Sequence, residues 1–200
     1  MSLTDYAGLQ ASIASWLMRD DLTAAIPDFI SLAEADMNNR LRLRAMLTTA
    51  SMDATGGALP DDCLAVRSVE LADYGHLGFA SDAETAQFAV GYRGGAARWF
   101  SIDGDTLVVS PTQVGDGTVT LRYYARIPAL SDSNTSNHVL AASPGIYLYG
   151  SLLQAAPYLL DDARMQTWGT LYTQALEGLQ GADDAAEYPG PLVIRAEGHW

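Results

Sequence analysis

The sequence predicts an α+β protein, in which helices from both ends of the chain form one bundle and a β-rich part is inserted between them. Apolar residues recur at three- and four-residue intervals in about the first 45 residues and again after about residue 130. Between these regions the period changes to alternation, which is typical of half-buried strands. We expect one structural unit with N-terminal bundle helices in residues 1–45, an antiparallel β-rich insertion in 46–130, C-terminal bundle helices in 131–187 and an extended tail in 188–200.

Two amphipathic helices are expected before residue 45. Thr4 is a suitable N-cap for the first helix, and Asp20-Asp21 interrupts its apolar pattern. The second helix begins near Pro27, because proline is tolerated in the first turn of a helix. It carries an uninterrupted apolar stripe, so we expect it to continue to Arg44 before the chain switches to strand; the stripe consists of Ile30, Ala33, Met37 and Leu41.

Alternation is clearest in residues 118–127, where apolar side chains would share one face: Val119, Leu121, Tyr123, Ala125 and Ile127. Asp103-Gly104 predicts a hairpin turn between two short strands, because both residues adopt positive φ easily. Gly56-Gly57 and the stretch 115–117 indicate further turns. Ser81 and Glu84 have the spacing of a capping box, which predicts a short helix inside the β region.

The C-terminal third is predicted to be helical again. Residues 146–160 are apolar on nearly all sides, so this helix should be central in the bundle, with a kink at Pro157. Asp161-Asp162 then caps an amphipathic helix that Gly181 ends or loosens. The last dozen residues contain two prolines and no helical period, and we expect an extended tail.

Composition argues against an enzyme and against a protein that grips nucleic acid. The net charge is −13 and the chain contains no lysine, whereas phosphate binding needs clustered cations. His76, His138 and His199 lack the spacing of metal ligands, and Cys63 has no evident histidine partner. We therefore expect no catalytic, metal or cofactor site. With no leader segment and no apolar run of membrane-spanning length, we expect a soluble protein that binds no membrane.

Two segments resemble a known family. The first, residues 123–168, is YYARIPALSDSNTSNHVLAASPGIYLYGSLLQAAPYLLDDARMQTW, and the second, residues 26–46, is IPDFISLAEADMNNRLRLRAM. The first has a strand that ends in Y-x-A-R-x-P, an Asn-rich loop, a P-x-x-Y-L-Y-G-x-L helix and D-D-x-R. Together they resemble the head-to-tail adaptor proteins of tailed bacteriophages, also called tail tubular protein A or head-tail connector proteins.

The resemblance implies a non-enzymatic virion protein at the head-tail junction, synthesised in the host bacterial cytoplasm. Copies would form a homo-oligomeric ring, a dodecamer, that sits on the portal protein and presents its other side to a tail or nozzle protein. The bundle would line a channel through which DNA passes without specific binding. An alternative of another class is a carbohydrate-binding or adhesion module of a virion, which would use the aromatic pairs Trp99-Phe100 and Tyr123-Tyr124 for stacking.

Three groups of residues are candidates for contacts. Arg40, Arg42 and Arg44 either pair with Asp36 and other acids of the same bundle, or contact the acidic flank of the next copy in a ring. Acidic residues of the last helices either face the DNA channel or lie outside it: Asp161, Asp162, Glu177, Asp183, Asp184 and Glu187. The tail either docks on the portal or adds a strand to the protein's own sheet, with Leu192, Val193, Ile194, Arg195 and Trp200 as contact residues.

Overall fold

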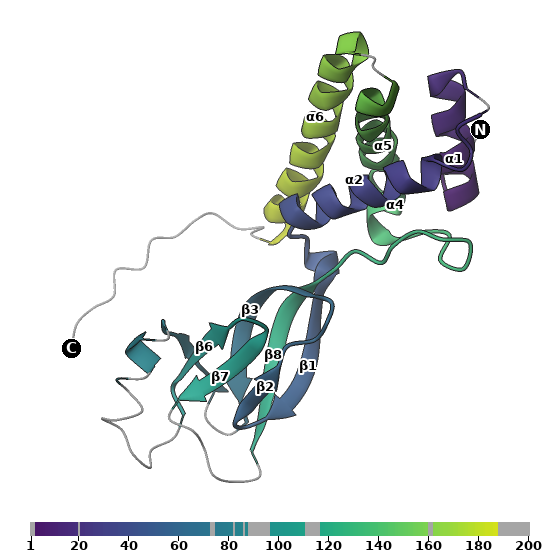
Figure 1. Ribbon diagram of the computed structural model, residues 1–200. Coiled ribbons are helices and arrows are strands. Elements are labelled where there is room, and N and C mark those ends of the chain that lie inside the picture. Colours follow the sequence, from purple (N-terminus) through teal and green to yellow (C-terminus); the bar gives the residue numbers. More distant parts are fainter. Residues whose placement is uncertain are drawn as a thin grey trace. The chain divides into compact units, whose positions relative to one another are not determined.

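The computed structural model describes residues 3–19, 21–72, 75–81, 83–85, 87, 97–110, 117–159 and 162–187. Helices and largely antiparallel sheets are both present (Figure 1), which confirms the α+β class. The chain divides into two compact units. Met1–Ala45 and Ile127–Trp200 belong to a helical unit, and Met46–Arg126 form a β unit.

The first two helices are α1 (Tyr6–Leu17) and α2 (Ile26–Arg40). The N-cap of α1 is Asp5 and not the expected Thr4, because the Asp5 carboxylate accepts a hydrogen bond from the backbone N–H of Gly8 at 2.7 Å. Met18 ends α1 in the left-handed conformation, with φ of 53°. Helix α1 therefore ends before Asp20-Asp21.

Helix α2 ends at Arg40, so the expected continuation to Arg44 is wrong. Leu41 has an extended backbone, and a short 3₁₀ helix, η1 (Arg44–Met46), precedes the first strand. The reason is the burial of both leucines of this stretch, Leu41 at 1% and Leu43 at 4% exposure. In an extended segment residues two apart share one side, whereas a continued helix would turn Leu43 well away from Leu41.

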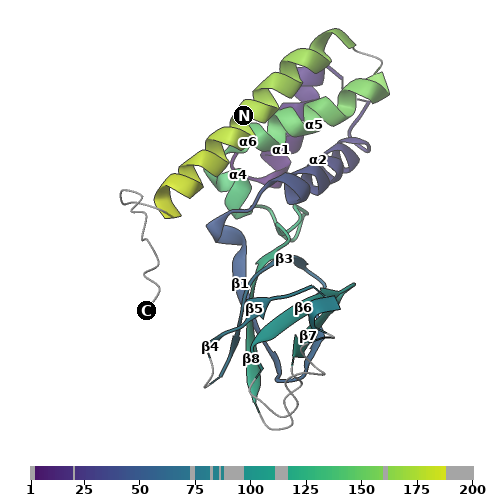
Figure 2. The same ribbon diagram turned by 90° about the vertical axis from the view of Figure 1, so that its left-hand side faces the viewer.

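Three more helices complete the helical unit: α4 (His138–Ala142), α5 (Pro144–Leu159) and α6 (Asp162–Glu187). Helix α5 packs against α1, α2, α4 and α6; Figure 1 shows it between α6 and α1, and Figure 2 shows it side by side with α6. Ile146, Tyr147 and Leu152 are completely buried. The expectation that this helix is central is confirmed, and Pro157 lies in its last turn.

Gly181 does not end α6, which continues to Glu187. Gly181 is exposed and no atom lies within 4 Å of the place where a Cβ would be. A glycine inside a helix costs only about 1 kcal/mol relative to alanine, which is too little to stop a helix that is packed elsewhere. The buried side of α6 consists of Trp168, Tyr172 and Leu176, one turn apart.

The β unit contains two four-stranded sheets. The first has the order β1-β8-β3-β4, with β1 (Leu47–Asp53), β8 (Thr118–Ala125), β3 (Cys63–Leu71) and β4 (Gly75–His76). The second has the order β2-β7-β6-β5, with β2 (Gly56–Ala58), β7 (Thr106–Ser110), β6 (Trp99–Asp103) and β5 (Gly78–Phe79). All pairs are antiparallel except β5 with β6.

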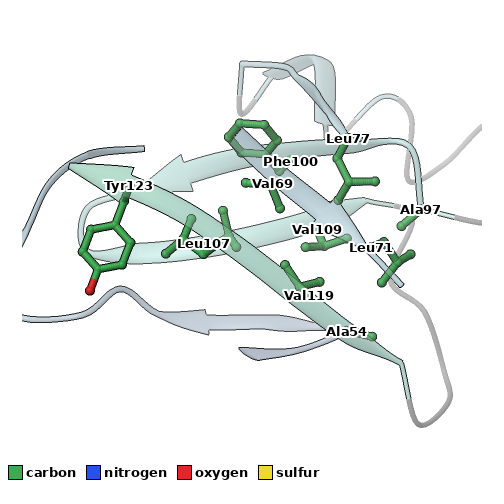
Figure 3. Packing of buried hydrophobic residues seen from close by; sticks show 11 residues of the cluster. Ala54, Val69, Leu71, Leu77, Ala97, Phe100, Leu107, Val109, Val119 and Tyr123 are labelled. Atoms are coloured by element: carbon green, nitrogen blue, oxygen red, sulfur yellow. The ribbon is translucent and has the colours of Figure 1, made fainter. Parts of the chain in front are cut away.

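The core of the β unit is formed by apolar side chains of both sheets (Figure 3). Val69, Val119 and Leu121 of the first sheet are fully buried and belong to one cluster with Leu107 and Val109 of the second. The predicted alternation of residues 118–127 therefore holds along β8, which ends at Ala125. One side chain on the opposite face, Tyr124, is also buried, because Arg67 lies over its ring and donates to its hydroxyl at 2.9 Å.

Two local predictions of the β unit are confirmed and one is displaced. Gly104, with φ of 58°, lies in the turn between β6 and β7. The carboxylate of Glu84 accepts the backbone N–H of Ser81 at 2.9 Å, and the backbone N–H of Glu84 donates to the Ser81 hydroxyl at 3.5 Å, so both hydrogen bonds of the expected capping box are present. The turn after β1 lies at Ala54-Thr55, whereas Gly56-Gly57 begin β2.

Candidate interaction surfaces

The arginine-rich end of α2 lies against α6. The guanidinium of Arg40 pairs with Asp36 one turn earlier, with Nε and Oδ2 2.9 Å apart. The guanidinium of Arg44 pairs with Asp183 of α6 at 3.1 Å, and the backbone N–H of Arg44 donates to the same carboxylate at 2.8 Å. Both arginines therefore have acidic partners in their own chain, as the first of the two sequence alternatives expected.

Arg42 is used differently from its neighbours. Its guanidinium donates to the carbonyl oxygen of Asn38 at 2.7 Å and so satisfies an acceptor in the last turn of α2. The side-chain amide of Gln180 on α6 binds both the N–H and the carbonyl oxygen of Arg42, at 3.1 and 3.3 Å. Residues 42–44 are thus fixed to α6 mainly through backbone groups.

These intrachain contacts leave room for further binding. The side chains of Arg40 and Arg44 are still 55% and 45% exposed, and a guanidinium has five N–H donors. Exposed ion pairs of this kind contribute at most about 1 kcal/mol to stability. A contact between these arginines and a neighbouring copy stays a prediction.

A hollow of about 200 Å³ opens between the C-terminal end of α2 and α6. It is lined by Arg40, Leu41, Thr173, Leu176, Glu177 and Gln180. The leucines are nearly buried, so they form an apolar floor, while the charged side chains stand at the rim. Beside the hollow, the buried hydroxyl of Tyr172 donates to Asp36 at 2.9 Å, and burial together with this carboxylate raises the pKa of Tyr172.

The acidic residues of α6 are not equivalent. Asp183 is only 15% exposed and its two oxygens bind Arg44, which makes it unsuitable as a free negative charge on a channel wall. Glu177 and Asp184 are exposed, although Asp184 accepts a hydrogen bond from Gln180 at 2.9 Å. Glu187 is half-buried at the end of the helix. Asp161 and the side chain of Asp162 lie outside the described residues.

Large apolar side chains are exposed on the helical unit, and the sequence analysis missed them. Met18 is 84% exposed, Tyr158 64%, Leu32 53% and Trp16 46%. Trp16, which the periodicity places on a buried stripe, contacts the ring of Tyr149 edge-on at a centroid distance of 5.9 Å. These exposed residues lie on three helices, with Trp16 and Met18 at the end of α1, Leu32 on α2 and Tyr158 on α5.

A buried polar network was also missed. The carboxylate of Glu34 on α2 accepts hydrogen bonds from the backbone N–H of Leu130 at 2.8 Å and from the hydroxyl of Tyr147 on α5 at 3.0 Å. The side-chain amide of Asn137, which caps α4, donates to the same tyrosine oxygen at 2.6 Å. Burial raises the pKa of Glu34. The network fixes the segment 127–137 on the helical unit.

The signal for this network was present in the sequence as a spacing. Glu34 and Asn38 lie four residues apart, beside the apolar stripe of α2, and both bind backbone N–H groups of the segment after the β unit. Asn38 accepts the N–H of Ile127 at 2.8 Å. The four-residue spacing of Glu34 and Asn38 indicates that both could bind the same segment, but only the fold shows that this segment is residues 127–130.

The described residues give no support to catalysis. Among them no three His, Cys, Asp or Glu side chains are placed to hold a metal ion. Burial, with a smaller contribution from Asp62, raises the pKa of the Cys63 thiol, which disfavours the reactive thiolate. Nε2 of His138 is buried without a hydrogen-bond partner, and burial lowers the pKa of this imidazole.

The aromatic pairs proposed as a sugar platform are mostly buried. Phe100, Tyr123 and Tyr124 are between 5% and 8% exposed, and Trp99 is half-buried. The hydroxyl of Tyr123 donates to Asp62 at 3.0 Å, and burial raises the pKa of Tyr123 to about 12. No flat aromatic surface for carbohydrate results from these residues. In the described part of the chain, no helix has the length and apolarity needed to cross a membrane.

Comparison with protein families decides which class of protein this is. The family model of the SU10 adaptor protein matches residues 4–195. The chain belongs to the SU10 adaptor protein family. The match covers nearly the whole chain, including both units, so the resemblance carried by residues 26–46 and 123–168 is confirmed. Comparison with curated proteins gave no match.

Membership of the SU10 adaptor family makes the chain a phage adaptor protein and a component of the virion. Adaptors of this kind interact with other virion components and are not typically enzymes. The relevant sites of this adaptor are therefore its contact surfaces. The predicted docking residues Leu192, Val193, Ile194, Arg195 and Trp200 lie outside the described residues, and their role stays a prediction.

Proposed function

We propose that this adaptor forms a homo-oligomeric ring, a dodecamer, at the head-tail junction of a phage. The ring binds the portal protein on one side and a tail or nozzle protein on the other, and it extends the DNA channel. The observation that carries the proposal is the family match over residues 4–195. The exposed apolar side chains of the helical unit, Met18, Tyr158, Leu32 and Trp16, support the proposal because they are available for contacts with other proteins.

The arrangement of the helical unit supports contacts between unlike surfaces of neighbouring copies. Helices α1 and α6 both pack against α5 and lie on different sides of it (Figure 1). Residues 162–187 contain five acidic residues and one arginine, whereas residues 3–19 contain one of each. Contact of α6 with another α6 would bring like charges together, while contact of α6 with α1 would not. A contact between unlike surfaces is heterologous and generates a ring when its rotation closes.

The hollow beside Arg40 supplies a receptor for such a contact. Its apolar floor and charged rim suit an apolar side chain from the next copy, and among the described residues of the helical unit Met18 is the most exposed large apolar one. Arg40 and Arg44 would then lie inside the interface and meet acidic groups of the neighbour with their unused N–H donors. Arg42 would act indirectly, by holding this segment on α6.

Exposed acidic residues of α6 are suited to a channel that DNA crosses. Glu177 and Asp184 present negative charge to solvent, and a negative wall repels phosphate and prevents DNA from binding to it. Asp161, Asp162 and Glu187 complete this proposed set. Asp183 is left out, because Arg44 neutralises it.

The proposal is tested by electron microscopy of the full-length adaptor mixed with the portal protein of the same phage. We expect class averages in which a second ring is stacked coaxially on the portal ring. A portal that forms its own ring but never carries this second ring would contradict the proposal. The Met18→Asp variant tests the contact between unlike surfaces separately. A charge at this position should prevent insertion into the apolar hollow of the next copy, so normal assembly of the variant on the portal would exclude Met18 from the interface.

A further inference from the structure

The open edges of the two sheets differ greatly in length. Three edge strands have only two or three residues, namely β2, β4 and β5, whereas β1 has seven. Short edge strands are one way in which natural proteins avoid unwanted pairing with other chains. The first sheet thus has one long edge, β1.

Only one side of β1 is paired. It forms seven consecutive residue pairs with β8, from Leu47 with Tyr124 to Asp53 with Thr118, without a bulge. Among the described residues no backbone hydrogen bond joins the other side of β1 to another strand. The backbone groups on that side are therefore available to a further strand.

The usual protections of an exposed edge are missing from β1. Its first six residues contain no charge and no proline, and the register with β8 shows no irregularity. Strand β3, which pairs with the other side of β8, has in contrast two register shifts against it. A long and regular edge whose first six residues carry no charge is a site at which another strand can pair.

The side chains of β1 also indicate what such a strand would look like. Ala50 and Met52 pack against the core of the β unit, whereas Thr49 and Ser51 are exposed. A strand added to this edge would place every second residue beside Ala50 and Met52 and the others in solvent. Apolar residues at alternate positions of the added strand would thus extend the existing core.

We propose that the C-terminal segment of this chain, residues 188–200, pairs with β1 as a fifth strand of the first sheet. Thirteen residues follow Glu187, and they reach about 43 Å when extended, whereas seven-residue β1 needs about 23 Å. The segment contains the apolar run Leu192, Val193 and Ile194, of which two residues are β-branched.

The sequence of the segment fits this edge in two ways. Leu192 and Ile194 are two residues apart, so both would face the core beside Ala50 and Met52 while Val193 points outward. Pro191 directly precedes the run, and proline is accepted as the first residue of an edge strand because its missing N–H breaks no ladder bond there. The pairing would thus give Leu192 and Ile194 an apolar partner within the adaptor itself.

Amide hydrogen exchange of the full-length protein, followed by NMR, tests the pairing. We expect the β1 amides that point away from β8 to exchange at least ten times more slowly than unpaired amides. In an added strand, every second backbone N–H donates a hydrogen bond to β1. One of the two variants Val193→Pro and Ile194→Pro therefore removes such a hydrogen bond, and the β1 amides should then exchange faster. Gly198→Pro, outside the apolar run, is the matched control and should leave them protected, and amides bonded to β8 should stay slow in all variants.

Three results would overturn the proposal. Fast exchange of the outward β1 amides in the unmodified protein means that the edge is open. Protection that survives both proline variants means that something else covers β1, such as the β1 of a second copy. A synthetic peptide of residues 188–200 that binds the portal protein, while β1 exchanges fast, means that the segment docks there. Protection of β1 by the segment supports the proposal in either of two forms. Protection that persists on dilution indicates pairing within one copy, and protection that is lost on dilution indicates that the segment of one copy pairs with β1 of another. Neither result depends on ring formation.

Discussion

Glu34 is a buried carboxylate that joins three segments of the helical unit. It is 6% exposed and accepts hydrogen bonds from Leu130 and Tyr147. Removing the carboxylate by Glu34→Ala leaves a buried backbone N–H and weakens the network, so we expect a loss of about 2–3 kcal/mol in the free energy of unfolding. Urea unfolding measures it. Glu177→Ala, an exposed carboxylate of the same unit, should change stability by less than about 0.5 kcal/mol, and equal losses in both variants would refute the role of the network.

The pKa of Glu34 gives a second prediction at this scale. Burial raises the pKa of the folded state above the ordinary value of 4.5, so the folded protein holds this proton more tightly than the unfolded chain. Stability from this group is complete below pH 4.5 and is lost as pH rises through the raised pKa. Glutamine does not titrate, so the Glu34→Gln variant does not lose this contribution. The unfolding free energy of the variant minus that of the unmodified protein should therefore increase as the pH rises from 4 to 8. A difference that is constant over this range would contradict the assignment.

Single residues were predictable from the sequence where their partners are close in the chain. Gly104 in its turn and Glu84 with Ser81 lie within three residues of the groups that explain them. The partner of Arg44 is Asp183, 139 residues away, and no local pattern contains that pairing. Tyr147 and Tyr158 lie on the same helix, α5, yet Tyr147 is buried with Glu34 as its hydrogen-bond partner whereas Tyr158 is exposed.

At the level of elements, period and composition predicted the type of structure better than its ends. The apolar helix at residues 146–160 and the alternating strand at 118–127 appear as α5 and β8. The ends of α2 and α6 were wrong for opposite reasons. Burial of Leu43 stopped α2 early, whereas packing through Trp168, Tyr172 and Leu176 carried α6 past Gly181. Tertiary packing overrides local propensity at such ends.

Two helical glycines test this view of the elements. Gly181→Ala in α6 should stabilise the protein by about 0.5–1 kcal/mol, because the new methyl group meets no atom within 4 Å and the unfolded chain loses freedom. Gly150→Ala in α5 should destabilise it by about 1–3 kcal/mol, because a Cβ there would lie 2.9 Å from the ring of Tyr172 and 3.2 Å from Ala33. Thermal unfolding of both variants measures the difference, and the same sign for both would contradict the packing.

At the level of the whole molecule, the sequence predicted the class and the family, but it could not predict the surfaces. Trp16 lies in the last turn of α1 and Met18 ends this helix, and their exposure depends on which helices pack around α1. The hollow beside Arg40 combines α2 with a helix about 130 residues later. Contacts between copies depend on such composite surfaces and therefore stay at the level of proposals.

Assembly should depend on the arginines at the end of α2. We expect the double variant Arg40→Ala/Arg44→Ala to weaken ring assembly on the portal at least tenfold, because both guanidinium groups remain half exposed beside the hollow. The double variant should lose only about 1 kcal/mol in the free energy of unfolding, since surface ion pairs contribute little. Arg19→Ala removes another exposed arginine that is paired with Asp21 and serves as the control. Intact assembly of the double variant would exclude the arginines from the interface.

The measurement that tests the central claim most directly is the mass in solution of the full-length adaptor, by light scattering, alone and after mixing with the portal of the same phage. The account predicts that the mixture contains a complex whose mass equals the portal ring plus one ring of adaptor copies. A portal that is itself a competent ring and gains no mass from the adaptor would contradict the account.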